Sequence, residues 1–213
     1  MVFEKYSNLE GCHAFMSPSQ SHWLRYDDDK LIDRYRKMQA VERGNELHKY
    51  AHDAIRLNRF QPRNKDSVNM FVNDAIGYRM SSEQPLFYHS LCFGTADAID
   101  YRKNFLRIHD LKTGETEAHM DQLKVYAALF CLNYQALVRE WRESGMGDIQ
   151  IATRLDLKTN ELHFDPMQMK GIELRIYQYG DIRVENPEPE EIVSIMNLIV
   201  HDVDVLINRE AEE

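Results

Sequence analysis

Two aspartates and a lysine lie close together in the middle of this 213-residue sequence. Asp97 falls within one apolar run, while Asp110 and Lys112 stand two residues apart at the end of the next run. Carboxylate oxygens are preferred ligands of Mg²⁺ and Mn²⁺, and a neighbouring ammonium can offset negative charge that develops on a reacting phosphate. Residues of these types in this order suit metal-assisted hydrolysis of a phosphodiester bond.

A β-hairpin would position these groups. Residues 93–101 and 105–111 are rich in apolar side chains and are joined by three polar residues that suit a tight connection. Asp97 would lie on the first strand beside Asp110 on the second. Because side chains alternate along a strand, Lys112 projects on the same face as Asp110. The sequence therefore predicts that two carboxylates and an ammonium converge.

A helix is predicted to follow at about residue 120 and to lie over the hairpin. Its apolar residues recur at helical spacing, at positions 120, 123, 127, 130 and 131. Gln122 and Tyr126 are four residues apart and share another stripe of this helix.

Four motifs follow one another between Arg43 and Tyr126. They are R-G-N-E-L-H ending at His48, G-T-A-D ending at Asp97, D-L-K beginning at Asp110 and Q-L-x-x-Y beginning at Gln122. In this order they resemble the PD-(D/E)XK nuclease superfamily, and within it the RecB-type branch with its single-domain phage and bacterial nucleases. The resemblance covers residues 48–126, and four ordered motifs are far more specific than D-x-K alone.

The resemblance implies a restriction-endonuclease-like α/β fold, in which a mixed β-sheet core is flanked by helices and preceded by a helical N-terminal region. It also implies a Mg²⁺- or Mn²⁺-dependent deoxyribonuclease, with exonuclease action favoured over endonuclease action and DNA favoured over RNA. The site residues that it implies are the metal ligands His48, Asp97, Asp110 and the carbonyl of Leu111, the catalytic lysine Lys112, and Gln122 and Tyr126, which would border the site and orient Lys112 or the substrate phosphate. Some relatives carry an iron–sulfur cluster on four cysteines; this chain has three cysteines, so no cluster is expected.

Length and composition predict one domain with one substantial core, since 43% of the residues are hydrophobic. We expect a single domain over residues 1–213, with a helical part at 1–85, a sheet core at 86–186 and a closing helix at 187–213. No apolar run is long enough to span a bilayer, and the N-terminus lacks the apolar core of a signal peptide, so a cytoplasmic protein without membrane contact is expected. Because no helicase, zinc-binding or target-recognition domain is apparent, substrate choice would come from a protein partner, from a homo-oligomer or from the N-terminal helices.

The net charge of −9 hides a polarised sequence. Residues 34–65 hold nine basic and three acidic residues, whereas residues 181–213 hold two basic and ten acidic ones. Contact with phosphates needs only a local basic face. A solvated helix surface is the plainer reading of this basic run. If this basic run binds nucleic acid, the candidate contact residues are Arg34, Arg36, Arg43, Lys49, Arg56 and Arg59. The acidic C-terminal helix would then face away from the nucleic acid.

The remaining pattern predicts the elements around the site. Ser17 and Pro18 predict a short helix that carries Trp23 and Leu24 toward the core, and Asp27–Asp29 read as a solvated helix end. Helices are further expected at 33–57, at 68–78 and from Pro189, where Ile192, Ile195, Met196, Ile199, Val203 and Leu206 share one face. Strands are expected at 86–92 and 149–155, and a second hairpin at 171–177 and 181–185. The second D-L-K-T, which begins at Asp156, lacks the flanking motifs and reads as a turn.

Two other functions compete with a nuclease. One is a non-catalytic protein built on the nuclease fold that binds or inhibits another protein. A chain freed from catalysis has no chemical need for the acidic pair of Asp97 and Asp110, which counts against it. The other is a zinc hydrolase that uses His48 and His52, but this reading lacks a nearby acid and a third matched ligand.

Overall fold

The structure is a computed structural model that describes residues 7–9 and 11–210. The chain divides into two compact units, Met1–Glu46 and Leu47–Glu213. The expectation of one domain over residues 1–213 stays a prediction. The first unit holds the 3₁₀ helices η1 (Ser7–Leu9) and η2 (Pro18–Arg25) and most of helix α1 (Asp28–Arg56), whose residues 47–56 belong to the second unit.

The first unit confirms the predicted helix start after Ser17, but α1 begins at Asp28 and not at residue 33, and not all of the predicted packing is found. A helix begins after Ser17, although it is a 3₁₀ helix, and Asp27 caps α1 by accepting a hydrogen bond of 2.8 Å from the Lys30 N–H. Helix α1 continues through Gly44 without a break. The expected burial of Leu24 is wrong, because 69% of this residue is exposed.

The second unit is an α/β fold with a five-stranded mixed sheet, as predicted. The strands lie in the order β1-β2-β3-β4-β5, and all neighbours are antiparallel except β3 and β4. The strands are β1 (Ser81–His89), β2 (Cys92–Arg102), β3 (Phe105–Leu111), β4 (Gly171–Gln178) and β5 (Asp181–Glu185). The other helices are α2 (Ser67–Gly77), α3 (Asp121–Glu143), α4 (Asp148–Arg154), α5 (Pro189–Glu210) and the 3₁₀ helices η3 (Thr159–Glu161) and η4 (Pro166–Gln168).

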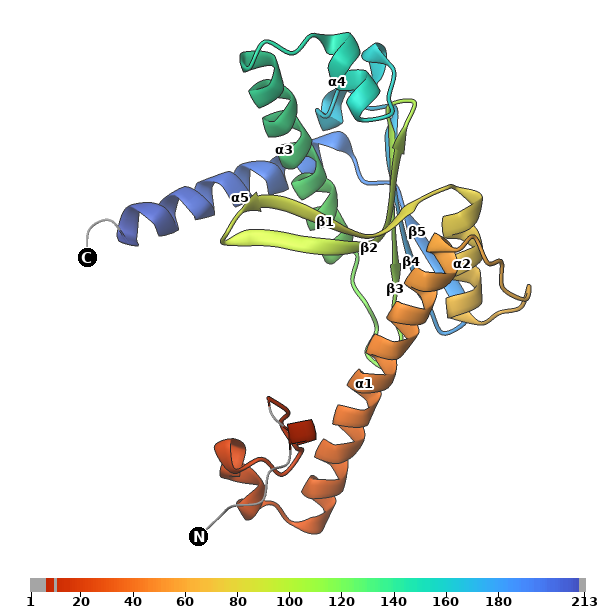
Figure 1. Ribbon diagram of the computed structural model, residues 1–213, viewed down its shortest axis with the longest axis vertical. Helices are drawn as coiled ribbons and strands as arrows, with labels where there is room; N and C mark the ends of the chain where they lie inside the picture. Colours follow the sequence, from red (N-terminus) through yellow and green to blue (C-terminus); the bar gives the residue numbers. More distant parts are fainter. Residues whose placement is uncertain (1–6, 10, 211–213) are drawn as a thin grey trace. The chain divides into compact units, whose positions relative to one another are not determined.

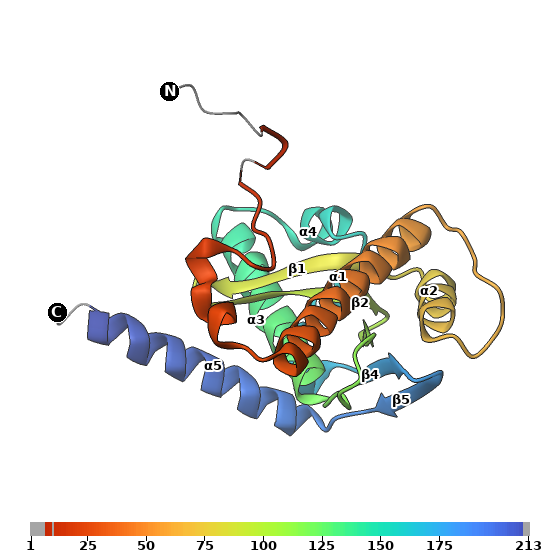
Figure 2. The ribbon, with the colours of Figure 1, turned by 90° about the horizontal axis from the view of Figure 1, so that it is seen from below.

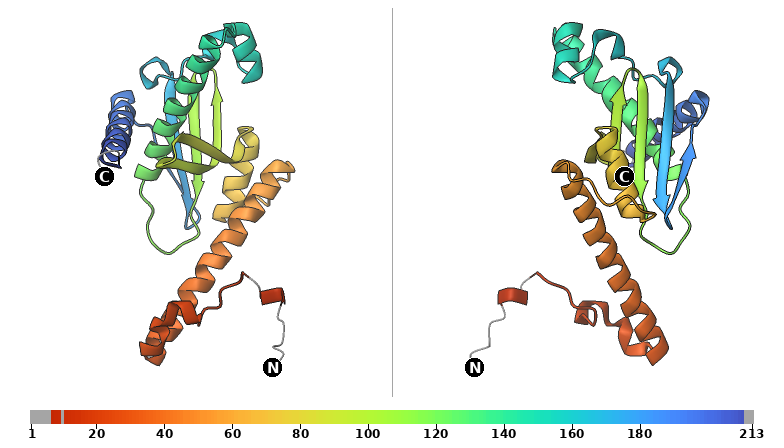
Figure 3. Two further views of the ribbon diagram at one scale, coloured as in Figure 1. Left: turned by 60° about the vertical axis from the view of Figure 1, so that its left-hand side comes forward. Right: turned by 90° about the vertical axis from the view of Figure 1, so that its right-hand side faces the viewer.

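Helices cover both faces of the sheet (Figure 1). Helix α2 packs on β3 and β4 from one side, and α3 packs on β1 and β3 from the other, as Figure 3 also shows. The larger core lies on the side of α3, α4 and α5, and a second core lies between the sheet, α2 and the end of α1. Parallel strands need a long crossover, which α3 and α4 supply between β3 and β4.

Two-residue turns with positive φ close both predicted hairpins. Lys103 and Asn104, with φ of 54° and 61°, join β2 to β3, and Tyr179 and Gly180, with φ of 56° and 69°, join β4 to β5 (Figure 2). Such turns match the twist of antiparallel strands. At Gly180 a Cβ atom would lie 2.4 Å from the carbonyl oxygen of Lys65, so glycine is also required for space.

The structure corrects three predictions. Residues 149–154 lie in α4 rather than in a strand, because Ile151 and Ala152 are buried side by side while 76% of Ile149 is exposed, which is a helical and not an alternating pattern. Strand β1 begins at Ser81, within the part expected to be helical, and not at residue 86. Leu206 of α5 is 49% exposed, so the predicted apolar face is not buried at that end.

No helix in the described part of the chain is long and apolar enough to cross a membrane.

Candidate functional site

Strand β2 brings three acidic residues to neighbouring positions. Ala98 is paired with Ser82 of β1 on one side and with His109 of β3 on the other. The next position along β2 is Asp97, which therefore stands between Glu83 of β1 and Asp110 of β3. Direct cross-strand neighbours have Cβ atoms about 5 Å apart, so like charges at these positions repel unless something offsets them.

The β1–β2 hairpin is kinked at this point. Glu83 has a φ of 51°, and the regular pairing of the two strands is interrupted there. On one side of the kink Ala98 belongs to the core under α2, and on the other side Ala96 belongs to the core under α3. A non-glycine residue with positive φ inside a strand is uncommon and marks a constrained position.

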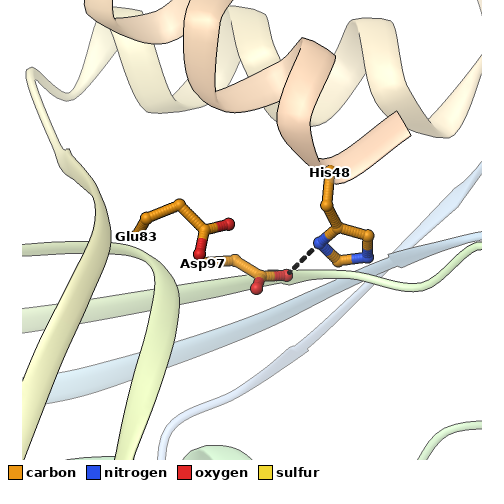
Figure 4. A group of neighbouring side chains, drawn as sticks. All are labelled: His48, Glu83 and Asp97. Carbon is orange, nitrogen blue, oxygen red and sulfur yellow. Dashed lines mark ion pairs between the residues drawn. The ribbon is translucent and has the colours of Figure 1, made fainter. Parts of the chain in front are cut away.

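His48 and two of the carboxylates converge from three elements (Figure 4). The Nδ1 atom of His48, on α1, lies 3.4 Å from Oδ2 of Asp97. Ligand atoms of His48, Glu83 and Asp97 all lie within 4.8 Å of one another. The same Oδ2 of Asp97 accepts a hydrogen bond of 2.9 Å from the backbone N–H of Leu111, which fixes this carboxylate against β3.

A chain of hydrogen bonds extends from Asp110 to helix α3. The Lys112 ammonium donates to Oδ1 of Asp110 over 3.2 Å and to the side-chain oxygen of Gln122 over 2.8 Å. The amide nitrogen of Gln122 donates in turn to the Tyr126 hydroxyl over 3.1 Å. A Cβ atom on Gly94 would lie 2.8 Å from the Tyr126 ring, so the glycine makes room for this tyrosine under the hairpin.

The second oxygen of Asp110 lacks a hydrogen-bond partner. Asp110 is 1% exposed, and among the described residues its Oδ2 accepts no hydrogen bond, although Lys112 Nζ lies 3.0 Å away outside hydrogen-bond geometry. Burial, and then the charge of Asp97, raises the pKa of Asp110 to about 6. This oxygen forms an ion pair with Lys112 but accepts no hydrogen bond, so it can still accept a second cationic partner.

The other ionisable groups of the site are shifted for related reasons. The hydrogen bond with Asp97 raises the pKa of His48, against the opposing effect of burial. Burial, followed by the negative charge of Asp97, raises the pKa of Glu83. Shifts that come from burial and from like charges are typical of functional sites, and a divalent cation would relieve both. The imidazole and carboxylates therefore fit such a cation.

The site residues that the resemblance implies, from His48 to Tyr126, all lie in this region of the second unit, and one acidic residue beside them was not predicted. Leu111 contributes its N–H to Asp97, while a role for its carbonyl stays a prediction. Glu83 was not predicted because residues 81–85 read as a break in the chain. Alternation along β1 would not have placed Glu83 opposite Asp97, because that position depends on the register between β1 and β2. His52 accompanies the site without joining the group, since its Nδ1 lies 2.9 Å from the Ser82 hydroxyl.

The opposite face of β3 holds a buried polar network, in which Nε2 of His109 has no hydrogen-bond partner among the described residues. His109 is fully buried, and its Nδ1 lies 3.1 Å from the hydroxyl of Tyr177. This hydroxyl donates over 2.6 Å to Asp74 of α2, which also accepts a hydrogen bond of 3.1 Å from Arg175. Burial lowers the pKa of His109, so its imidazole is neutral, and the network links β3, next to Asp110, to β4 and α2.

The candidate basic residues are exposed in both units. In the second unit Lys49, Arg56 and Arg59 are exposed, and Arg56 lies 3.6 Å from Asp53 in an exposed ion pair that holds it only weakly. In the first unit Arg34, Arg36 and Arg43 are likewise exposed. The acidic helix α5 was expected to face away from the nucleic acid. Its first turn is held to α3, the helix that carries Gln122 and Tyr126, by an ion pair of 2.6 Å between Glu191 and Lys124.

Comparison with known proteins adds no family to these observations. No protein-family model, no curated protein and no solved structure matches this chain. The resemblance to RecB-type nucleases stays a prediction from its four motifs, and the geometry of the site has to carry the functional argument.

Proposed function

We propose that the chain is a Mg²⁺- or Mn²⁺-dependent nuclease of the RecB-type PD-(D/E)XK kind, acting on DNA. One observation carries the proposal: Lys112, which binds Asp110 and Gln122, follows Leu111, whose N–H binds Asp97 of a group of side chains that could hold a metal ion. Nucleases need these two functions, metal ligation and a fixed positive charge, at one phosphate.

The residues divide the work between them. His48, Glu83 and Asp97 would hold the cation, with the free oxygen of Asp110 and the carbonyl of Leu111 available to it. The chemistry that a divalent cation supplies when bound here is polarisation of a phosphate oxygen and acidification of a nearby water.

The ammonium of Lys112 would offset negative charge that develops on the phosphate. Its position is set on one side by Asp110 and on the other by Gln122, which Tyr126 fixes in turn. A charge placed in advance stabilises a transition state without the cost of reorganising at the moment of reaction.

A cleavage assay with a matched control tests this function. Purified protein is incubated with linear, circular and single-stranded DNA, and with RNA, in Mg²⁺, in Mn²⁺ or in chelator. We expect metal-dependent cleavage that Asp97→Asn abolishes and Asp156→Asn leaves intact. Cleavage of linear but not circular DNA would support the exonuclease. A wild-type protein that binds Mn²⁺ and cleaves none of these substrates would favour the non-catalytic binding protein.

A further inference from the structure

The tip of the β1–β2 hairpin carries an exposed aromatic pair. Phe87 and Phe93 are direct cross-strand partners, their ring centroids are 6.4 Å apart, and 54% and 67% of the two residues are exposed. The hairpin extends from the rest of the sheet across α3 (Figures 1 and 3), with which β1 is in contact. Two adjacent large apolar rings that are exposed to solvent, on the same strands as the candidate site, indicate a surface that binds a ligand or partner.

The outer face of the hairpin connects this pair to the candidate metal site. Exposed and inward residues alternate along β1, so positions 83, 85 and 87 share the outer face, and 93 and 95 do so on β2. Pro85 pairs with Thr95 between the aromatic pair and the position where Glu83 stands opposite Asp97. The outer face is thus a track with aromatic rings at one end and the metal-ligating group at the other.

The track would not repel a polyanion, because it holds no acidic residue, and it holds no lysine or arginine either. Residues 84–95 include none of the 35 acidic residues of the chain. Along β1 and β2 the acidic residues that flank this stretch are Glu83 and Asp97, whose charge a cation would offset. A phosphate backbone could therefore follow the track to the site without meeting like charge.

We propose that Phe87 and Phe93 stack against unpaired bases of a single-stranded nucleic acid whose backbone reaches the His48–Glu83–Asp97 group. The inference rests on the proposed nuclease function, which supplies the polynucleotide. Each phenylalanine lies four positions along its strand from the acidic residue, and a strand rises about 3.3 Å per residue, so the rings lie about 13 Å from the site along the strands. A stacked strand advances about 3.4 Å per nucleotide, so the contacted bases lie about four nucleotides from the reacting phosphate.

Binding rather than cleavage is the direct test. Fluorescence anisotropy measures the affinity for labelled oligothymidylates of 2 to 12 nucleotides, and for the RNA equivalents, in Ca²⁺ without turnover. Stacking on one aromatic ring is worth about 1 to 3 kcal/mol per base, so Phe87→Ala/Phe93→Ala should weaken binding by about 10-fold or more. Phe87→Trp/Phe93→Trp should retain it, and Leu198→Ala, at another exposed apolar residue, should leave it unchanged. Affinity should rise most between two and about six nucleotides.

Several outcomes would overturn the inference. Equal oligonucleotide affinity in the wild type and the double alanine variant would do so, as would an equal loss for a blunt duplex without unpaired bases. A wild-type dimer that dissociates in the variant with no change in affinity would make the pair a self-association surface.

A shift of the melting temperature by Mn²⁺ reports whether the metal site survives in each variant. A variant that keeps this shift and loses oligonucleotide affinity supports the stacking contact. If the wild type cleaves nothing but the variant still loses affinity, the nuclease function fails and the stacking contact survives. If the wild type cleaves and the variant binds as tightly as the wild type, the stacking contact alone fails.

Discussion

The tetrapeptide Asp-Leu-Lys-Thr occurs twice, at residues 110–113 and 156–159, and the two copies fold differently. In the first copy Asp110 is buried in β3, and Lys112 binds both it and Gln122. In the second copy Asp156 is exposed after α4 with a φ of 53°, and Lys158 is exposed before η3. An identical sequence thus forms a charged site in one place and a solvated turn in the other.

The difference lies in what the rest of the chain places beside each copy. The first copy has β2 alongside, which supplies Asp97, and α3 above, which supplies Gln122. The second copy has Glu161, whose carboxylate accepts hydrogen bonds from the backbone N–H groups of Lys103 and Lys158 and so closes a turn. A short motif acquires chemical meaning only when separate elements bring partners to it.

The largest contrast is expected between the two lysines. Lys112→Ala should lower the rate of DNA cleavage by about 100- to 1,000-fold, which is typical for the loss of one preorganised charged or hydrogen-bonding group. Lys158→Ala should leave the rate within about 2-fold, because its side chain is exposed in a turn. Initial rates at saturating Mg²⁺ measure both. Equal losses in the two variants would break the comparison.

The two aspartates should differ in how stability depends on pH. Because the folded pKa of Asp110 is raised from 3.8 to about 6, its protonated form favours the folded state, and this stability is present below about pH 4 and lost as the pH rises through 6. Asp110→Asn should therefore stabilise the metal-free protein at pH 8 by about 1 to 3 kcal/mol and have little effect at pH 4. Asp156→Asn, at an exposed aspartate of the second copy, is the matched control.

Urea unfolding of the metal-free wild type and of both variants at pH 4, 6 and 8 gives these free energies. A stability of Asp110→Asn that equals that of the wild type at pH 8 would show that Lys112 fully offsets the buried charge.

Two glutamates near the two copies should separate metal binding from folding. Glu83→Gln removes a charged ligand, so the affinity for Mn²⁺ should fall by about 10-fold or more. Glu161 is 8% exposed and accepts two backbone hydrogen bonds, so Glu161→Gln should lower the free energy of unfolding by about 1 to 2 kcal/mol and leave metal affinity unchanged. Calorimetric titration and urea unfolding measure the two quantities. Unchanged Mn²⁺ affinity in Glu83→Gln would remove Glu83 from the site.

Local patterns predicted most of the fold because they coincide with what the tertiary structure needs. The β2–β3 hairpin, the inward stripe of α3 and the turn reading of Asp156 follow from alternation, helical spacing and missing partners. The strand prediction for residues 149–155 was wrong. Ile149 and Ile151 suggest the alternation of a strand, whereas the structure buries the adjacent residues Ile151 and Ala152 in a helix. A seven-residue segment is too short for periodicity alone to decide between helix and strand.

Glu83 could not be predicted from local pattern. Its place in the site depends on a positive φ inside β1 and on the register between β1 and β2, and both are set by contacts between segments distant in sequence. The same holds for the free oxygen of Asp110, because burial on this scale requires α3 and the whole sheet. The sequence therefore predicted which motif residues belong to the candidate site. It did not predict how deeply each of them is buried or how their pKa values are shifted.

The smallest effect is expected in the salt dependence of nucleic-acid binding, and it sharpens the comparison of the two copies. Each phosphate that the protein neutralises contributes about −0.7 to −0.9 to the slope of log affinity against log salt. Reversing Arg56 and Arg59 together should flatten the slope by about 1.5 to 2, because both are exposed near the end of α1. Lys158→Glu in the second copy should barely change it, as should reversal of Glu188 and Glu190, since exposed charges more than about 8 to 10 Å from the bound strand are screened. The slopes are obtained by measuring nucleic-acid affinity in Ca²⁺ at salt concentrations from about 50 to about 300 mM, a range that includes physiological ionic strength. If Lys158→Glu flattens the slope as much as the arginine reversals do, the second copy also contacts nucleic acid, and the division between a charged site and a solvated turn has to be redrawn.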